Sequence, residues 1–185
     1  MPNWCSNVVT FSHSNPDAVK RIVDAWRTGE FMQQFFPCPE ELINAVKGFN
    51  SDPVEQDKIN AAMIANSAKY GFPTWYEWSI ANWGTKWDIG EKDQELDYKL
   101  GDSEVTIRFD SAWNPPLTFY GRMIELGYNI KAYYYEPGMC FCGFWYNGVD
   151  TSYKIPGHSS EVAGVIPADI DEAFDISNTM AEWEE

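Results

Sequence analysis

Apolar and polar residues alternate over short segments of this chain, and a period of two is typical of strands that bury one face. In residues 105–110, Val105, Ile107 and Phe109 share one face, and the residues between them are polar. Asn147 and Gly148 indicate a tight hairpin near the C-terminal end of the pattern. Composition and turn signals predict further strands at residues 7–11, 83–89, 129–135, 139–146 and 149–155.

Two other segments place apolar residues three and four positions apart, which is the spacing of one helix face. The first helix is expected to begin at Pro16, and the second to begin after Pro116 and end at Gly127. Their buried positions would be Val19, Ile22, Val23 and Trp26 in the first helix, and Leu117, Tyr120, Met123 and Ile124 in the second.

The region from about residue 30 to residue 84 interrupts this regular pattern, and we interpret it as an insertion that lies over the sheet. Within it, a helix is predicted for residues 53–70, capped by Ser51 or Asp52. The positions of this helix that we expect to be buried are Ile59, Ala62 and Met63.

The order of elements is β-α-insertion-β-β-α-β, which predicts an α+β, ferredoxin-like domain over residues 1–155. Its antiparallel sheet would have the order 4-1-3-2, with both helices on one face and the C-terminal hairpin as an extension. Residues 156–185 are expected to form an acidic C-terminal extension. The expected core consists of Val9, Phe11, Ile22, Trp26, Ile107, Phe109, Tyr120, Ile124 and Ala132.

The chain is strongly acidic, with 28 Asp and Glu against 13 Lys and Arg, a formal net charge of −15. Direct nucleic-acid binding depends on cations that displace counterions, so this charge disfavours it, and it disfavours an anionic membrane surface as well. The partner that it favours is a host protein with a basic surface. The chain has neither a long apolar stretch nor the start of a secretory signal, so we expect a cytoplasmic protein.

The acidic residues are concentrated in residues 88–104 and in the tail after Lys154, which contains no Lys or Arg. Such segregated charge favours encounter with a basic groove, although it could equally serve solubility. The residues predicted to contact a partner are Asp88, Glu91, Asp93, Glu95, Asp97, Asp102, Glu104, Glu161, Asp169, Asp171 and Glu172.

Tryptophans form the alternative candidate site. Aromatic rings on a sheet can stack on bases or on a small ligand, but they can equally be core residues of a small sheet protein. The residues of this predicted aromatic cleft are Trp75, Trp78, Trp83, Lys86, Trp87 and Trp113.

No catalytic motif is evident, and we assign no catalytic residue, cofactor or metal. His13 and His158 could act together as general acid and base, but neither has a nucleophile or basic partner placed beside it. Cys140 and Cys142 would share one face of a strand, yet the C-x-x-C spacing of zinc knuckles is missing. We therefore expect all the cysteines to be reduced thiols, namely Cys5, Cys38, Cys140 and Cys142.

Four motifs together resemble the YubB ferredoxin-like family, whose members occur on phages and conjugative plasmids. The motifs are Met1-Pro2-Asn3-Trp4-Cys5, Asn82-Trp83-Gly84-Thr85-Lys86-Trp87-Asp88, Ser111-Ala112-Trp113-Asn114-Pro115-Pro116 and Tyr135-Glu136-Pro137-Gly138. The resemblance spans most of residues 1–155 and implies a ferredoxin-like fold and an origin in a mobile element. It supplies no catalytic or ligand-binding residues.

Accessory proteins of mobile elements are often small acidic inhibitors of host defence. The resemblance and the charge together predict a non-enzymatic accessory protein that binds and inhibits a host defence protein, as an anti-CRISPR protein does, with mimicry of nucleic acid as one route. The alternative is a ligand-binding or single-strand nucleic-acid-binding module, or a small enzyme, that uses the aromatic cleft.

Overall fold

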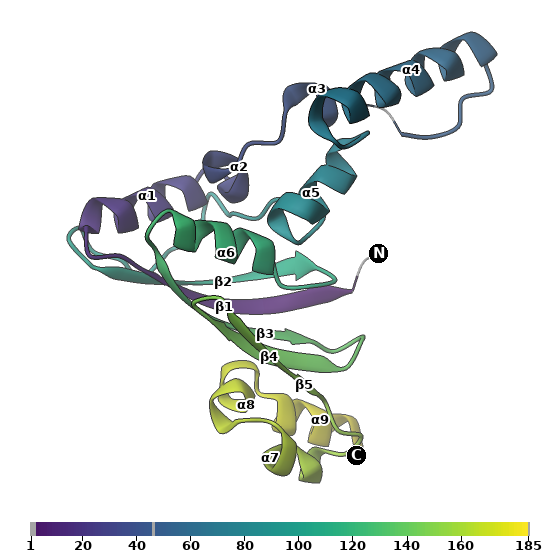
Figure 1. The fold of residues 1–185 in the computed structure, drawn as a ribbon. Coiled ribbons are helices and arrows are strands. Elements are labelled where there is room, and N and C mark those ends of the chain that lie inside the picture. Colours follow the sequence, from purple (N-terminus) through teal and green to yellow (C-terminus); the bar gives the residue numbers. More distant parts are fainter. Residues whose placement is uncertain (1–2, 46, 185) are drawn as a thin grey trace.

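The computed structural model describes residues 3–45 and 47–184 of the chain. It has a mixed α+β architecture, built on an antiparallel sheet with the strand order β2-β1-β3-β4-β5 (Figure 1). The strands are β1 (Trp4–Ser12), β2 (Glu104–Ala112), β3 (Asn129–Glu136), β4 (Phe141–Tyr146) and β5 (Val149–Lys154).

Strand β1 is an interior strand of the sheet between β2 and β3, where Val9 pairs with Ile107 of β2 and with Ala132 of β3. The predicted pairing of the first strand with residues 105–110 is therefore confirmed. The predicted strand at residues 83–89 is wrong. Trp83 ends a helix there, and Gly84 follows with a left-handed backbone (φ 86°). Without that strand, the sheet does not form the predicted order 4-1-3-2.

Helices α1 (Pro16–Trp26) and α6 (Leu117–Glu125) cover one face of the sheet, as predicted (Figure 1). The side chain of Asn15 caps α1 by accepting a hydrogen bond from the backbone N–H of Asp17. Of the expected core residues, all are buried except Phe109 and Ile124, which are half-buried. Phe109 lies on β2, at the edge of the sheet, where less of the molecule covers it.

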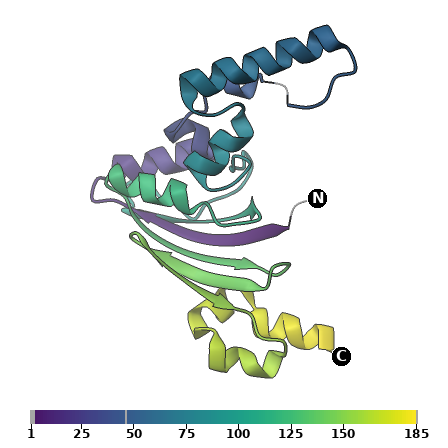
Figure 2. The ribbon, with the colours of Figure 1, turned by 45° about the vertical axis from the view of Figure 1, so that its right-hand side comes forward.

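The insertion contains α2 (Phe31–Phe35), α3 (Glu40–Ile43), α4 (Pro53–Tyr70) and α5 (Trp75–Trp83). Figures 1 and 2 show α2 and α5 beside the other helices, while α4 projects away from the sheet. Asp52 caps α4, as predicted. The expectation that the whole insertion covers the sheet is wrong for α4, whose single buried side chain among those described is Asn66. Ala62, expected to be buried, is exposed, and Ile59 and Met63 are half-buried.

The C-terminal segment packs on the opposite face of the sheet, through a 3-10 turn (Ser159–Glu161) and helices α7 (Val162–Val165), α8 (Ala168–Phe174) and α9 (Ile176–Glu184) (Figure 1). A second apolar cluster joins it to the sheet, formed by Cys142, Ile155, Val162, Ile166, Ile170 and Ile176. The acidic tail is therefore a folded layer with its own buried side. In the described part of the chain, no helix has the length and apolar character needed to cross a membrane.

Candidate functional site

The four sequence motifs meet at one end of the sheet, because antiparallel pairing brings the start of β1 beside the end of β2. The backbone N–H of Trp113 donates to the carbonyl of Asn3 (2.9 Å). The Thr85 hydroxyl donates to the carbonyl of Ala112 (3.1 Å). A side chain at Gly138 would collide with Asn3, so the fourth motif lies against the first. Met1 and Pro2 of the first motif lie outside the described residues.

Three tryptophans from different motifs form a row at this end of the sheet. The ring centroids of Trp4 and Trp87 are 5.8 Å apart, and those of Trp87 and Trp113 are 6.5 Å apart with the rings nearly parallel. Trp4 and Trp87 are 47% and 38% exposed, which is high for such large apolar side chains. Trp113 has a left-handed backbone (φ 66°), which is unusual for a bulky residue.

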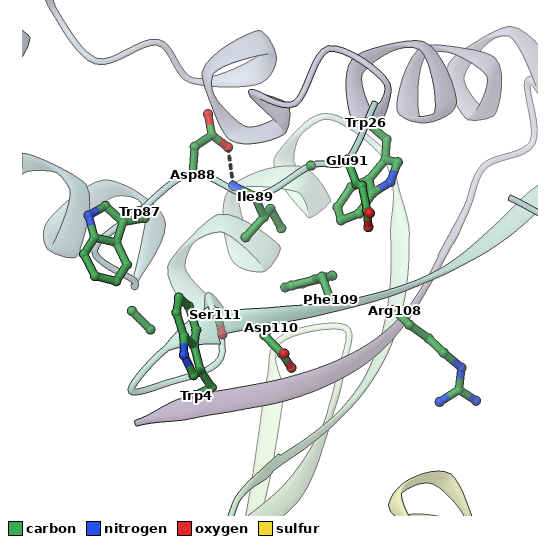
Figure 3. Close-up of a pocket in the computed structure, with 12 residues that line it drawn as sticks. Trp4, Trp26, Trp87, Asp88, Ile89, Glu91, Arg108, Phe109, Asp110 and Ser111 are labelled. Carbon is green, nitrogen blue, oxygen red and sulfur yellow. Dashed lines mark hydrogen bonds between the residues drawn. The ribbon is translucent and has the colours of Figure 1, made fainter. Parts of the chain in front are cut away.

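A cavity of about 250 Å³ opens beside this row, and we refer to it as the tryptophan cleft. Trp4 and Trp87 border it on one side, and Ile89 and Phe109 lie in its middle (Figure 3). Its other lining residues include Trp26, Asp88, Glu91, Arg108 and Asp110.

The charged groups around the cleft are mostly acidic. The guanidinium of Arg108 extends away from the tryptophans (Figure 3) and donates to the carbonyl of Ala173 in α8 (3.3 Å). Asp110 accepts a hydrogen bond from the Ser6 hydroxyl (2.7 Å). The exposed side chain of Glu91 has no cationic partner among the ion pairs of the described residues. Among the charged residues that line the cleft, three carboxylates (Asp88, Glu91 and Asp110) therefore outnumber one guanidinium (Arg108).

Asp88, one of the acids predicted to contact a partner, has a structural role. Its carboxylate accepts hydrogen bonds from the backbone N–H groups of Met32 (2.6 Å), Gln33 (2.9 Å) and Ile89 (2.7 Å), so it binds the N-terminal end of α2. Burial raises the pKa of Asp88, although these three hydrogen bonds act in the opposite direction.

The other acids of this region face the solvent, and two of the residues between them are half-buried. Glu91, Asp93, Glu95 and Asp97 are exposed, and we refer to residues 91–97 as the acidic segment. Between them, Gln94 and Leu96 are half-buried, and Leu96 packs against the core. Asp102 accepts from the backbone N–H of Lys99 (2.7 Å), which stabilises a turn, and the exposed Glu104 begins β2.

The acids of the tail that were predicted to contact a partner lie in the C-terminal layer, on the opposite face of the sheet from α1 and α6. Asp169 accepts from the Tyr133 hydroxyl (2.6 Å), and Asp171 accepts from the backbone N–H of Ser177 (2.7 Å). Glu161 and Glu172 are exposed. The two acidic regions come near each other where Glu91 and Phe174 line a common cavity of about 440 Å³.

The six residues predicted to form an aromatic cleft do not all meet in one place. Trp78 and Trp83 are buried core residues in edge-to-face contact, and the indole N–H of Trp83 donates to the carbonyl of Phe36 (3.0 Å). Four of the six nevertheless line one separate cavity of about 250 Å³, namely Trp75, Trp83, Lys86 and Trp87. Trp4 was not among the candidate site residues predicted from the sequence, although it lines the tryptophan cleft. Its position in the first of the four motifs could have indicated it.

The described residues hold no group of three or more His, Cys, Asp or Glu side chains with the geometry of a metal site. Cys140 lies in the turn before β4 and is exposed, whereas Cys142 is buried, so the two do not share a strand face as predicted. His13 accepts from the backbone N–H of Asn15 (2.9 Å), whereas His158 lies near Glu184 in the C-terminal layer.

Cys5 is enclosed in a network of buried polar groups. The Asn7 amide donates to the Cys5 carbonyl (2.7 Å) and to the Ser111 hydroxyl (2.9 Å), and the Tyr120 hydroxyl donates to the oxygen of the Asn7 amide (3.3 Å). Burial raises the pKa of the Cys5 thiol to about 12. A thiol that stays protonated at neutral pH is a poor nucleophile. The hydrogen bonds of Asn7 join β1 to Ser111 of β2 and to Tyr120 of α6, so this network supports the fold of the motif end of the sheet.

No protein-family model matches the chain, and no curated protein matches it. Among solved structures, it is similar to the crystal structure of a protein api92 from Yersinia pseudotuberculosis, described with the family model DUF1281. The likeness has a TM-score of 0.41 and 12% sequence identity, and it covers 85% of this chain and 99% of that one. A likeness of this size carries no conclusion about function.

Proposed function

We propose that this chain is a non-enzymatic binding protein that contacts a basic segment of a partner protein through the tryptophan cleft and the acidic segment. The observation that carries the proposal is the position of Glu91, which belongs to the acidic segment and also lines the tryptophan cleft. The acidic segment and the tryptophan cleft thus adjoin each other in space, and Trp87 belongs both to this cleft and to the aromatic cleft predicted from the sequence.

Charge and exposure support this proposal. The exposed carboxylates of Glu91, Asp93, Glu95 and Asp97 take part in none of the ion pairs among the described residues. Unpaired carboxylates attract a basic partner and raise its rate of association. The exposed faces of Trp4 and Trp87 can contact both the charged group and the apolar stem of a long basic side chain.

In the form that the sequence predicts, the partner is a host defence protein with a basic groove for nucleic acid, and binding inhibits it. The protein would then act as a phage or plasmid accessory protein, with carboxylates in place of phosphates. The cleft adds an anchor to this mechanism, because a tryptophan surface contributes affinity that salt does not screen.

A second candidate function is binding of single-stranded nucleic acid. The observation that favours it is Lys86, whose ammonium lies 4.4 Å from the ring centroid of Trp87 and 5.4 Å from that of Trp113. Aromatic rings with an adjacent cation are the usual platform for stacked bases. The carboxylates of Glu91 and Asp110, which line the tryptophan cleft together with Trp87, weigh against a phosphate backbone.

The test compares a short peptide rich in arginine and lysine with a single-stranded oligonucleotide, each titrated at low and at high salt. We expect the peptide to bind, with affinity that falls as salt rises, and the oligonucleotide not to bind. Replacing Glu91, Asp93, Glu95 and Asp97 by Lys should abolish peptide binding.

A matched control replaces four exposed acids elsewhere, Glu40, Asp57, Glu125 and Glu182, by Lys and changes the net charge equally. This control should keep most of the affinity, because its charges lie away from the cleft. Equal losses in the two folded variants would show that only overall charge matters and would contradict the proposal. Binding of the oligonucleotide alone would favour the second function.

A further inference from the structure

The ammonium of Lys86 lies within reach of three aromatic rings. The distances from its Nζ to the ring centroids are 4.4 Å for Trp87, 5.4 Å for Trp113 and 5.6 Å for Tyr76. A cation within about 6 Å of a ring centroid is attracted by the negative face of that ring. We refer to Tyr76, Trp87 and Trp113 as the aromatic cage.

The three rings come from different parts of the fold, and each is held in place. Tyr76 lies in the first turn of α5, where its backbone N–H donates to the Thr74 hydroxyl (3.3 Å). Trp87 immediately precedes Asp88, which is fixed by its hydrogen bonds to α2. Trp113 follows β2 with a left-handed backbone (φ 66°), a strained conformation that directs its ring toward Trp87.

Lys86 is held there without a carboxylate partner. Lys47 also lies over the Tyr76 ring (5.3 Å), but its ammonium pairs with Glu77. Lys86 takes part in none of the ion pairs among the described residues. The rings are thus its main partners, which is how aromatic cages bind alkylammonium ligands.

We propose that the aromatic cage is a binding site for a basic side chain of the partner, and that Lys86 occupies it until the partner's cation displaces it. This inference rests on the proposed function and adds a specific anchor to it. Lys86 and Trp87 line a cavity of about 250 Å³ with Trp75 and Trp83, so space that an entering side chain could use lies beside the Trp87 ring of the cage. The flexible stem of a lysine can leave such a site at little cost.

The cage itself is tested with tetramethylammonium, which has no hydrogen-bond donor and therefore reports cation–aromatic attraction alone. We expect the Lys86→Ala variant to bind it in calorimetry and to show shifts of the Trp87 and Trp113 indole signals in NMR, while the wild type binds it more weakly. Lys86→Met keeps the apolar stem and should still exclude tetramethylammonium. A folded Lys86→Ala variant that does not bind it would overturn the proposal.

The displacement is tested with the basic peptide. Removing a cation strengthens binding of a basic peptide in any case, so Lys86→Met serves as the control for charge. It removes the same cation as Lys86→Ala but leaves an apolar side chain in the cage. We expect Lys86→Ala to bind the peptide more tightly than Lys86→Met by about twofold to thirtyfold, the range of one cation–aromatic interaction.

The outcomes separate the cage from the proposed function. If Lys86→Ala binds tetramethylammonium but neither it nor the wild type binds the peptide, the cage stands as a cation site and the proposed function fails. If the peptide binds and Lys86→Ala equals Lys86→Met, the proposed function stands, and the displacement of Lys86 is disproved.

Discussion

The carboxylate of Asp88 accepts a hydrogen bond from the backbone N–H of Met32 at 2.6 Å, which ties the segment after α5 to the start of α2. Asp88 begins the most acidic part of the sequence, yet it acts inside the fold. Its neighbour along the chain, Glu91, is exposed and lines the tryptophan cleft. Acids that look alike in the sequence therefore divide into a structural group and a surface group.

This division predicts different effects of the same substitution. Asp88→Ala removes the acceptor for three backbone N–H groups and should lower the free energy of unfolding by about 0.5–2 kcal/mol, as for other helix-capping residues. Glu91→Ala should change it by no more than about 0.5 kcal/mol, because the side chain is exposed. Urea unfolding of the two variants measures the difference. Equal stability of both variants would show that Asp88 does not support α2.

A second prediction concerns two residues on one face of β2. Ile107 is fully buried, whereas Phe109 is half-buried at the wall of the cleft. Ile107→Ala should cost about 2–5 kcal/mol of stability, the usual range for a large-to-small change in a core. Phe109→Ala should cost less, because part of its surface is already in contact with water. Thermal or urea unfolding tests this order, and a larger loss for Phe109 would contradict the described position of β2.

The cysteines should differ in reactivity. Cys140 is exposed, while Cys5, Cys38 and Cys142 are buried, and burial raises the pKa of Cys5 to about 12 and that of each of the other two buried thiols to about 11. Alkylation with iodoacetamide near neutral pH, followed by mass spectrometry, should modify Cys140 first. The buried three should react only after unfolding. Early modification of Cys5 in the folded protein would contradict its position.

The same raised pKa makes stability depend on pH in a defined direction. The folded protein keeps the Cys5 proton to about pH 12, whereas an ordinary cysteine releases it near pH 9.0. The contribution of Cys5 to stability is therefore complete below about pH 9 and is lost as the pH rises toward 12. Cys5→Ala should remove this part of the alkaline loss of stability.

Local pattern was sufficient where one element uses one periodicity. The alternation of Val105, Ile107 and Phe109 indicated β2, and the helical spacing before Trp26 indicated α1, because each element buries a single continuous face. The pattern failed between Trp83 and Ile89. The apolar residues of this segment pack in different places, because Trp83 ends a helix in the core and Trp87 lies in the exposed tryptophan row.

The tail shows a similar limit. Its acids were evident in the sequence, but its sparse apolar residues, including Val162 and Ile170, did not indicate that they form a cluster with Cys142 of β4. A buried face made from short helices has too few residues to produce a clear period. Only the opposite face of the sheet, left open by α1 and α6, gives these residues a surface to pack on.

By itself, the sequence determined the mixed α+β class, the central pairing of the first strand, the strong negative charge and the presence of four distinctive motifs. The tertiary structure alone decided that these motifs form one surface. Trp4 and Ala112 are 108 positions apart, yet they pair across β1 and β2, and this register brings Trp113 toward Trp87. Contacts at such separation depend on strand register and on loops that cross between layers, and no local period in a chain encodes them.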